Sequence, residues 1–390
     1  MGGRKMNRTC RVDYHSSAGI AIVSVMAAVV LLFILGAAML STGLQGQLFA
    51  LRTGSQIKAR CAADAGLAEA LWQMNQRLGR FSFDDSVLPE ASDSVLPNCN
   101  ARFSYAVRGD EQAGYSIECV GVCGPTSRKV GAKLRLRGLF DYGILVVDSA
   151  TLYSGTVVDR YNSADPGETD VAVQVASINT DPSSITLMPG AVIKGETLFG
   201  VDFDFPELVA PALPDKGTEI RLQGRTVGLT PADSGCYRGI TLMNGGGLQT
   251  ILEISGGHVE LHVTGDVWMG QGSQLVIKPD ASLSLFLDGN WTSNNSTGIN
   301  NETNIPACFK LYGMGTDQVL DLKAKQDWYG CIYAPTAEVS VKANSDLYGS
   351  IVARTFENKA KGTIRYDGAL SKVPADEIGV RFVVDRWYEN

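Results

Sequence analysis

Residues 18–40 read AGIAIVSVMAAVVLLFILGAAML, and this stretch decides how the chain is organised. It contains no charged residue, and about 20 such residues are enough to cross a bilayer as a helix. Arg4, Lys5, Arg8 and Arg11 precede it, and positive residues favour the cytoplasmic side of a membrane. We therefore expect Ala18 to Leu40 to be one transmembrane segment, with the N-terminus inside and the rest of the chain outside.

The helical pattern continues beyond the apolar stretch. Residues 44–78, LQGQLFALRTGSQIKARCAADAGLAEALWQMNQRL, carry apolar side chains mostly at helical spacings. No proline occurs in residues 1–88. One helix from residue 20 to residue 78 would be roughly 88 Å long at a rise of 1.5 Å per residue.

A short basic leader, then Gly19-Ile20, then this long helix resembles the N-terminus of type IV pilins and pseudopilins. Residues 50–71, ALRTGSQIKARCAADAGLAEAL, resemble minor pilins of the PilX type in particular. The resemblance implies that a prepilin peptidase cleaves between Gly19 and Ile20, and that the helix later packs in a filament core. Major pilins carry Glu at the fifth mature position, where this chain has Ser24, so the resemblance favours a minor or tip subunit.

The middle of the chain predicts a small antiparallel sheet. Residues 81–99 are rich in Asp, Ser and Pro and predict a loop. Period-two alternation is clearest at Val130, Ala132, Leu134 and Leu136, which would share one face of a strand. A long helix followed by a meander matches the plan of a pilin, in which such a sheet serves packing and subunit contact. The expected strands cover residues 101–108, 115–123 and 127–137.

From residue 140 onward, short β-rich runs end in Gly, Asp or Asn about every ten residues. The surroundings of Leu261 reappear 24 residues later at Leu285, and those of Tyr329 reappear 19 residues later at Tyr348. Repeats of this length suit one coil of a β-solenoid, although a sandwich or barrel would also have short strands. Together these signals predict a mainly β protein: a pilin-like helix, a small antiparallel sheet, and a right-handed parallel β-helix.

The run WYGCIYAPTAEVSVKANSDLYGSIVARTF at 328–356 resembles the C-terminal domain often fused to PilX-type helices, as do VVDRYNS at 157–163 and RYDGAL at 365–370. This resemblance implies a bactofilin-like β-solenoid without a catalytic site. We expect five segments: a leader (1–19), the helix (20–80), the meander (81–139), the solenoid (140–372) and a C-terminal tail (373–390).

Some parallel β-helices cleave polysaccharides, and an enzyme of that class would carry a pair of catalytic acids. Asn179-Thr180-Asp181 has the form found in polygalacturonase-type hydrolases, but an inverting mechanism needs a second acid about 6.5–9.5 Å away. The one Asp-Asp pair, Asp84-Asp85, precedes the repeats. His258 and His262 would share one face of a strand about 13 Å apart, too far for a metal pair. No catalytic residue is therefore assigned, and we expect a protein that is not an enzyme.

Cofactors and nucleic acid are not expected. Asp202, Asp204 and Glu207 could hold calcium, but exposed strand alternation before a proline explains them as well. The chain has 34 basic and 41 acidic residues and a net charge of −7, whereas nucleic-acid binding needs a basic surface.

The eight cysteines contain no CxxC pair, which disfavours zinc ribbons and thioredoxin-like chemistry. Export past the membrane permits disulfides. If residues 108–115 close a hairpin, Cys99 falls near Cys123, and we predict a bridge between them. Cys308 and Cys331 could stack on adjacent coils and form a second bridge, although buried free thiols are the alternative in both cases.

The sequence favours a non-enzymatic minor pilin-like subunit of a type IV pilus or a type II secretion-like assembly. Its partners would be other pilin subunits, the inner-membrane assembly platform, a prepilin peptidase and the bilayer. It would be a single-pass inner-membrane protein, with its C-terminal region in the periplasm or on the cell surface. Two alternatives remain: a membrane-anchored β-helix that binds or cleaves carbohydrate, and an envelope scaffold that polymerises through its solenoid.

Overall fold

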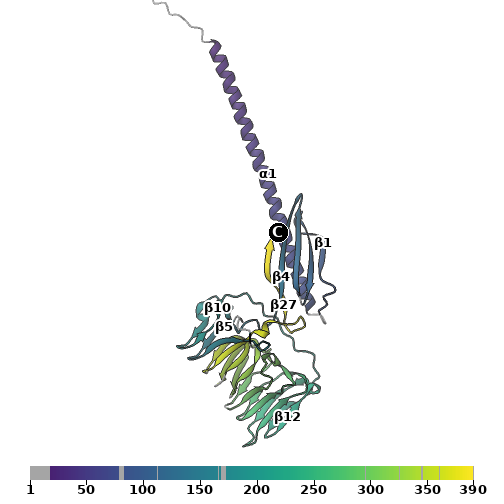
Figure 1. Cartoon of the computed structure of the whole chain (residues 1–390), viewed down its shortest axis with the longest axis vertical. Coiled ribbons are helices and arrows are strands. Elements are labelled where there is room, and N and C mark those ends of the chain that lie inside the picture. Colours follow the sequence, from purple (N-terminus) through teal and green to yellow (C-terminus); the bar gives the residue numbers. More distant parts are fainter. Residues whose placement is uncertain are drawn as a thin grey trace, which may run out of the picture.

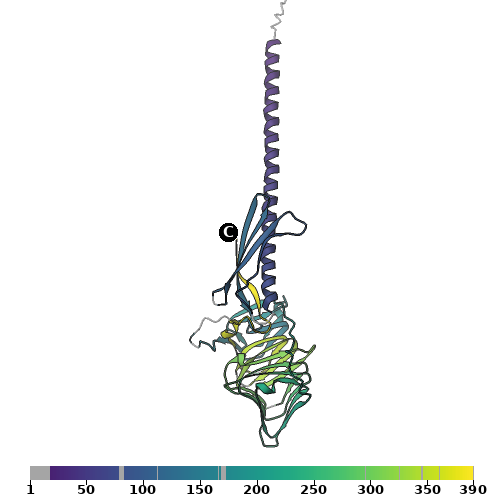
Figure 2. The ribbon, with the colours of Figure 1, turned by 90° about the vertical axis from the view of Figure 1, so that its right-hand side faces the viewer.

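The computed structural model describes residues 18–78, 83–111, 113–165, 167, 173–294, 296–324, 326–343, 346–359 and 361–389. The protein is mainly β, with one long N-terminal helix and several sheets (Figure 1). The helix extends away from the body of the molecule, an antiparallel sheet covers its second half, and parallel strands lie beyond that sheet (Figure 2).

The helix α1 runs without interruption over 61 residues, Ala18–Leu78. The apolar and amphipathic segments therefore form one continuous helix, as the sequence predicts. Its second half packs against the antiparallel sheet through small side chains, and Ala59, Ala62 and Ala63 are fully buried there. A Cβ atom at Gly121 of the facing strand would lie 2.0 Å from the Ala59 carbonyl oxygen, so the two backbones are in direct contact.

The antiparallel sheet has five strands in the order β1-β2-β3-β4-β27. We call this sheet, together with residues 59–78 of α1, the helix–sheet unit. The first strand lies within residues 81–99, where a loop was expected, and it pairs with β2 around a register shift. The strands are β1 (Glu90–Val95), β2 (Arg102–Asp110), β3 (Gly114–Cys123), β4 (Thr126–Arg137) and β27 (Arg381–Glu389).

Strand β27 corrects the expectation that residues 373–390 form a tail. It pairs antiparallel with β4, with Phe382 opposite Leu136. Phe382 is only 1% exposed and joins the core between α1 and the sheet. The segment pairs because β4 would otherwise present an open edge, and because a buried aromatic side chain stabilises the closed arrangement.

The remaining strands pair in parallel and form three ladders, which we call the ladder domain (residues 139–372). Three long strands, β5 (Ile144–Leu152), β24 (Trp328–Ala343) and β25 (Leu347–Asn358), take part in more than one ladder: β24 and β25 in all three, and β5 in two. The first ladder contains β11 (Glu219–Gln223), β14 (Gly239–Met243), β17 (Val267–Met269), β20 (Trp291–Ser293), β23 (Val319–Ala324), β24 (Trp328–Ala343), β25 (Leu347–Asn358), β5 (Ile144–Leu152) and β8 (Ile185–Leu187).

The second ladder has two parts, which meet where β21 contacts β24. Its strands are β12 (Thr226–Leu229), β15 (Thr250–Ile254), β18 (Ser273–Ile277) and β21 (Gly298–Asn301), then the first residues of β24 and β25, β26 (Thr363–Asp367), β6 (Val157–Tyr161) and β9 (Val192–Ile193).

The third ladder contains β13 (Gly235–Tyr237), β16 (His258–Val263), β19 (Ser282–Leu287) and β22 (Phe309–Gly313), then β24, β25, β5, β7 (Gln174–Ser177) and β10 (Glu196–Phe199). In the described residues, four short 3-10 helices connect strands: η1 (Pro182–Ser184), η2 (Pro231–Asp233), η3 (Pro306–Cys308) and η4 (Gly368–Ser371).

The ladders confirm both repeat offsets. Leu261 pairs with Leu285 and Tyr329 pairs with Tyr348, the positions related by 24 and by 19 residues in the sequence. The stack does not follow chain order, however, because Ile351 of β25 pairs with Ile144 of β5. The chain therefore enters the stack of coils in its middle, at β5, and adds strands in one direction as far as β10. Residues 200–218 then run to the opposite end of the stack, where β11 begins.

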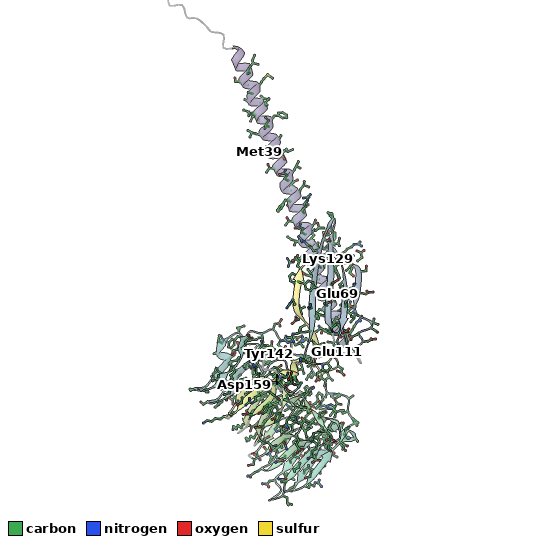
Figure 3. All side chains as sticks on the ribbon, in the orientation of Figure 1. Met39, Glu69, Glu111, Lys129, Tyr142 and Asp159 are labelled. Carbon is green, nitrogen blue, oxygen red and sulfur yellow. The ribbon has the colours of Figure 1, made fainter. Side chains whose placement is uncertain are left out.

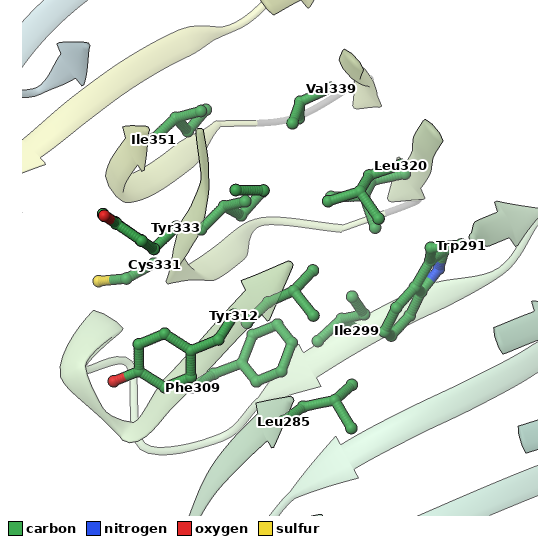
Figure 4. Close-up of a cluster of buried hydrophobic side chains, with 14 of the residues drawn as sticks. Leu285, Trp291, Ile299, Phe309, Tyr312, Leu320, Cys331, Tyr333, Val339 and Ile351 are labelled. Atoms are coloured by element: carbon green, nitrogen blue, oxygen red, sulfur yellow. The ribbon is translucent and has the colours of Figure 1, made fainter. Parts of the chain in front are cut away.

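A continuous apolar core lies between the ladders (Figure 4). Each coil contributes large side chains to it, and Trp291, Phe309 and Tyr312 are 1% exposed or less. The rings of Phe286 and Tyr312, which come from neighbouring coils, stack with centroids 4.8 Å apart. Each coil therefore buries its apolar side chains against its neighbours, which is how repeat architectures of this kind gain stability.

Candidate functional site

The first half of α1 is an exposed apolar surface. Every residue from Ile22 to Arg52 is exposed, including Phe33 at 80% and Met39 at 76% (Figure 3). Within the part of the chain that the structure describes, α1 is the one helix long and apolar enough to cross a membrane. Such a surface is unfavourable in water and is stabilised by an apolar environment such as a bilayer.

The predicted processing site lies at the start of this helix. Gly19 and Ile20 belong to the first turn of α1. Residues 1–17, which hold nearly all of the expected leader, lie outside the described residues. Cleavage between Gly19 and Ile20 stays a prediction.

The four cysteines of the predicted disulfides are free in this structure. The Cys99 and Cys123 sulfur atoms lie 4.0 Å and 3.6 Å from the same oxygen, Asn100 Oδ1, so the hairpin does bring the two thiols to one place. Cys331 is fully buried on β24, with its sulfur 3.8 Å from the Pro306 carbonyl oxygen, and Cys308 lies on the adjacent coil. Both bridges remain predictions that chemical mapping can test.

The tripeptide Asn179-Thr180-Asp181 forms a turn. Asn179 Oδ1 accepts a hydrogen bond from the Asp181 backbone N–H at 3.0 Å, and the Asp181 carboxylate accepts one from the Ser183 N–H at 2.8 Å. The carboxylate thereby caps η1, and these hydrogen bonds hold the pKa of Asp181 below its usual value. The pair Asp84-Asp85 lies in the segment between α1 and β1, where Asp85 accepts a hydrogen bond from the Tyr115 hydroxyl.

His262 occupies a chain of polar contacts across three coils of the third ladder. Its Nδ1 lies 3.9 Å from the Cys236 sulfur and its Nε2 lies 3.0 Å from the Asp288 carboxylate. A nucleophilic cysteine needs a lowered pKa. Here burial and the carboxylates of Asp215 and Asp288 raise the pKa of Cys236, so the contacts do not make an activated thiolate.

Asp202, Asp204 and Glu207, the candidate calcium ligands, lie in the connection between β10 and β11. The Asp204 carboxylate accepts a hydrogen bond from Arg381 of β27 at 2.7 Å, which ties this connection to the helix–sheet unit. Among the described residues, no group of three or more His, Cys, Asp or Glu side chains is arranged to hold a metal ion.

A pocket of about 740 Å³ opens on the second ladder, on the part of the molecule where Figure 3 labels Asp159. The strand register places its tyrosines and Asp159 in one row: Tyr329 pairs with Tyr348, Tyr348 with Arg365, which lies beside the pocket, and Arg365 with Asp159. Because parallel strands place paired residues on the same face about 4.8 Å apart, these side chains form one outward row. The pocket is lined by Asp159, Arg160, Tyr161, Asn162, Ser163, Thr303, Asn304, Ile305, Tyr329 and Tyr348.

Three tyrosines give the pocket its aromatic surface. The rings of Tyr329 and Tyr348 stack with centroids 4.3 Å apart and an interplanar angle of 12°, and Tyr161 meets Tyr348 edge-on at 5.2 Å. Burial, with the neighbouring Tyr348, raises the pKa of Tyr329 to about 12, so this phenol is protonated at neutral pH. Among the described residues, the buried Tyr161 hydroxyl has no hydrogen-bond partner.

Paired charges border the tyrosines. Lys194 donates to the Asp159 carboxylate at 2.9 Å, and Arg365 lies 4.0 Å from Asp159 and 3.2 Å from Asp346. Burial alone would raise the pKa of Asp159, but the hydrogen bond from Lys194 and the nearby positive charges outweigh it and lower that pKa. Asp159 is therefore ionised at neutral pH, and two acidic and two basic side chains compensate one another.

The sequence alone does not predict this pocket, although residues 157–163, Tyr329 and Tyr348 fall in recognisable stretches. In the sequence, Tyr329 and Tyr348 mark the repeat, and Asp159 and Tyr161 belong to a run that resembles a family motif. A signal was present in the repeat itself. Ile332 and Ile351 are fully buried, whereas the tyrosines at the start of each repeat are only partly buried. Aromatic rings repeated at an outward position are a candidate binding surface.

Comparison with known proteins gives the following similarities. The model of a domain of unknown function (DUF7305) matches residues 215–373. No curated protein matches the chain. One similar solved structure is the competence-associated pilin ComZ from Thermus thermophilus, with a TM-score of 0.23 and 12% identity over 86% of this chain and 98% of that one. Another is an ice-binding protein from the Antarctic ascomycete Antarctomyces psychrotrophicus, with a TM-score of 0.26 and 15% identity over 59% of this chain and 96% of that one. Superpositions with TM-scores this low carry no conclusion about function.

Proposed function

We propose that the chain is a minor pilin-like subunit of a type IV pilus or a type II secretion-like assembly, anchored by α1 and carrying a right-handed β-solenoid head. The observation that supports this proposal is that one part of α1 is packed against the protein itself and another part is exposed. Residues 59–78 are packed against the subunit's own sheet, whereas residues 22–52 are apolar and exposed. A plain anchor needs only about 20 apolar residues, so an exposed helical segment of this length leaves apolar surface for contacts beyond the bilayer.

Leu44, Leu48 and Leu51 supply that surface. They lie beyond the expected membrane span of Ala18 to Leu40 and are 55%, 56% and 69% exposed. Their spacings place them close to one face of α1, where a neighbouring helix could cover them. The proposed partners are other pilin subunits and the inner-membrane assembly platform, reached after prepilin peptidase has removed residues 1–19.

The proposed role is structural, and the head is displayed rather than catalytic. Ser24 stands where major pilins carry Glu, which favours a minor or tip position over the repeating shaft. The resemblance to pilins supports an inner-membrane protein with an internal N-terminus, and a ladder domain in the periplasm or on the cell surface.

The variant Leu48→Asp tests assembly separately from membrane insertion. It leaves residues 18–40 intact but places a charge on the exposed helix. We expect the full-length variant to stay in the membrane fraction and to disappear from filaments sheared off the cell. Val209→Asp, at an apolar residue that is 81% exposed outside the helix, is the matched control and should assemble normally. If Leu48→Asp is recovered in filaments at the wild-type level, α1 does not pack against other subunits.

A further inference from the structure

The tyrosine pocket combines a ring surface with fixed hydrogen-bonding groups. Tyr348 is held by the stacked ring of Tyr329, the edge of Tyr161, and Arg365, whose guanidinium lies 5.7 Å from the ring centroid. The rings are therefore positioned before a ligand arrives, which lowers the ordering cost of binding. A volume of about 740 Å³ is within the usual range of roughly 300–1,000 Å³ for small-ligand sites.

The charges of the pocket disfavour an ionic ligand. Asp159 is already paired with Lys194 and Arg365, and Arg365 is also paired with Asp346. A ligand carrying a single charge would have to break one of these pairs. A ligand with hydroxyl groups can instead use the free lone pairs of the Asp159 carboxylate, which lines the pocket, without breaking a pair.

The rim adds further hydrogen-bonding groups. Thr303 and Asn304 lie on the turn before η3, opposite the end of β6. The Thr303 hydroxyl is hydrogen-bonded to Asn301 Oδ1 at 2.6 Å, whereas the Asn304 side chain is exposed. The Tyr161 hydroxyl is buried and has no accessible surface, so Tyr161 lines the pocket with its ring.

We propose that this pocket binds a neutral oligosaccharide, whose ring C–H face packs on the tyrosines and whose hydroxyl groups bond Asp159 and Asn304. An aromatic surface beside planar hydrogen-bonding groups suits a sugar, because a sugar ring is apolar on its faces and rich in hydroxyls at its edge. This inference goes beyond assembly, since it concerns only the ladder domain and does not depend on how α1 is packed.

Calorimetric titration of the full-length protein tests the proposal. The protein is held in lipid nanodiscs, because the sugar headgroups of maltoside detergents would compete for the site. The probes are cellohexaose, maltohexaose and chitohexaose, with inorganic phosphate as the ionic probe. We expect saturable binding of at least one oligosaccharide and none of phosphate.

Three variants locate the binding. Tyr348→Ala should weaken it at least tenfold, and Asn304→Gly should weaken it several-fold. Asn304 has a positive φ of 57°, so a glycine there removes the side-chain amide without straining the backbone. This second variant therefore still tests the proposal if Tyr348→Ala fails to fold. Tyr153→Ala, at an exposed tyrosine outside the pocket, should bind like the wild type.

Two outcomes would overturn the proposal. One is that no oligosaccharide binds saturably to the folded wild-type protein, or that only phosphate does. The other is that the folded Tyr348→Ala and Asn304→Gly variants bind a probe as tightly as the wild type does.

Discussion

Asn75 and Phe382 exchange two hydrogen bonds although they lie 307 positions apart in the chain. Asn75 Nδ2 donates to the Phe382 carbonyl oxygen at 3.1 Å, and the Phe382 N–H donates to Asn75 Oδ1 at 2.7 Å. The side-chain amide of Asn75, near the end of α1, thus bonds the backbone of β27 as a neighbouring strand would. The last strand of the chain is thereby tied to the helix, and the ladder domain is inserted between β4 and β27.

Replacing Asn75 with alanine should destabilise the helix–sheet unit. The substitution removes both hydrogen bonds and leaves two backbone groups of β27 without this partner, which costs about 1–3 kcal/mol for a buried group. The free energy of unfolding of the full-length protein in urea measures the effect. Gln76→Ala, at an exposed position in the same helical turn, is the control and should change it little. Equal stability of both variants would show that the contact does not hold β27.

Gly121→Ala should separate α1 from the sheet. The added methyl group would lie 2.0 Å from the Ala59 carbonyl oxygen and 2.5 Å from the Ala63 nitrogen, so the helix or β3 has to move. Overpacking of this kind costs about 1–3 kcal/mol. Thermal unfolding provides the measurement. In the control Gly228→Ala, the new methyl group meets nothing within 4 Å, and the melting temperature should hold or rise slightly. A wild-type melting temperature for Gly121→Ala would contradict the close helix–sheet contact.

The sequence indicated most of this fold because its signals are local or strictly repeated. The apolar run of residues 18–40 and the helical spacing after it predicted α1. The recurrences at Leu261 and Tyr329 predicted coil neighbours that the strand register confirms. Parallel stacking places equivalent side chains above one another, so identical residues recur at the coil length.

The pairing of Ile351 with Ile144 and of Phe382 with Leu136 could not be predicted in the same way. Each joins segments more than 200 residues apart, so neither contact leaves a periodic pattern in the sequence. The tyrosine pocket was missed for a related reason. Its two sides, at Asp159 and Asn304, lie far apart in the chain, and they meet because β5 and β6 stack on the late strands β25 and β26.

Peptide mapping under non-reducing conditions tests the cysteine predictions. We expect protein isolated from the cell envelope to yield one peptide pair that joins Cys99 to Cys123, because both sulfurs already lie within 4.0 Å of Asn100 Oδ1. The same map tests the pair Cys308 and Cys331. Cys61, exposed on α1, should be alkylated in either case. Complete alkylation of Cys99 and Cys123 without a reductant would remove the first bridge.

Alkaline pH should unfold the ladder domain through its tyrosines. Burial raises the pKa of Tyr312 and Tyr366 above that of an unfolded tyrosine, near 10. A raised folded-state pKa contributes stability that is complete below pH 10 and is lost as the pH rises further. Tyrosinate absorbance and circular dichroism, followed together, should show the buried tyrosines ionising only as the structure is lost. Ionisation of all 13 tyrosines near pH 10 with unchanged circular dichroism would contradict their burial.

The mature N-terminus tests the central claim, that α1 is a pilin-like assembly helix. The protein is purified from membranes of cells with and without an active prepilin peptidase, and its N-terminal residues are sequenced. Cleavage between Gly19 and Ile20 predicts a mature chain that begins Ile20-Ala21-Ile22 when the peptidase is present and an intact leader when it is absent. A chain that keeps residues 1–19 in both strains would contradict the account and leave α1 as a plain membrane anchor.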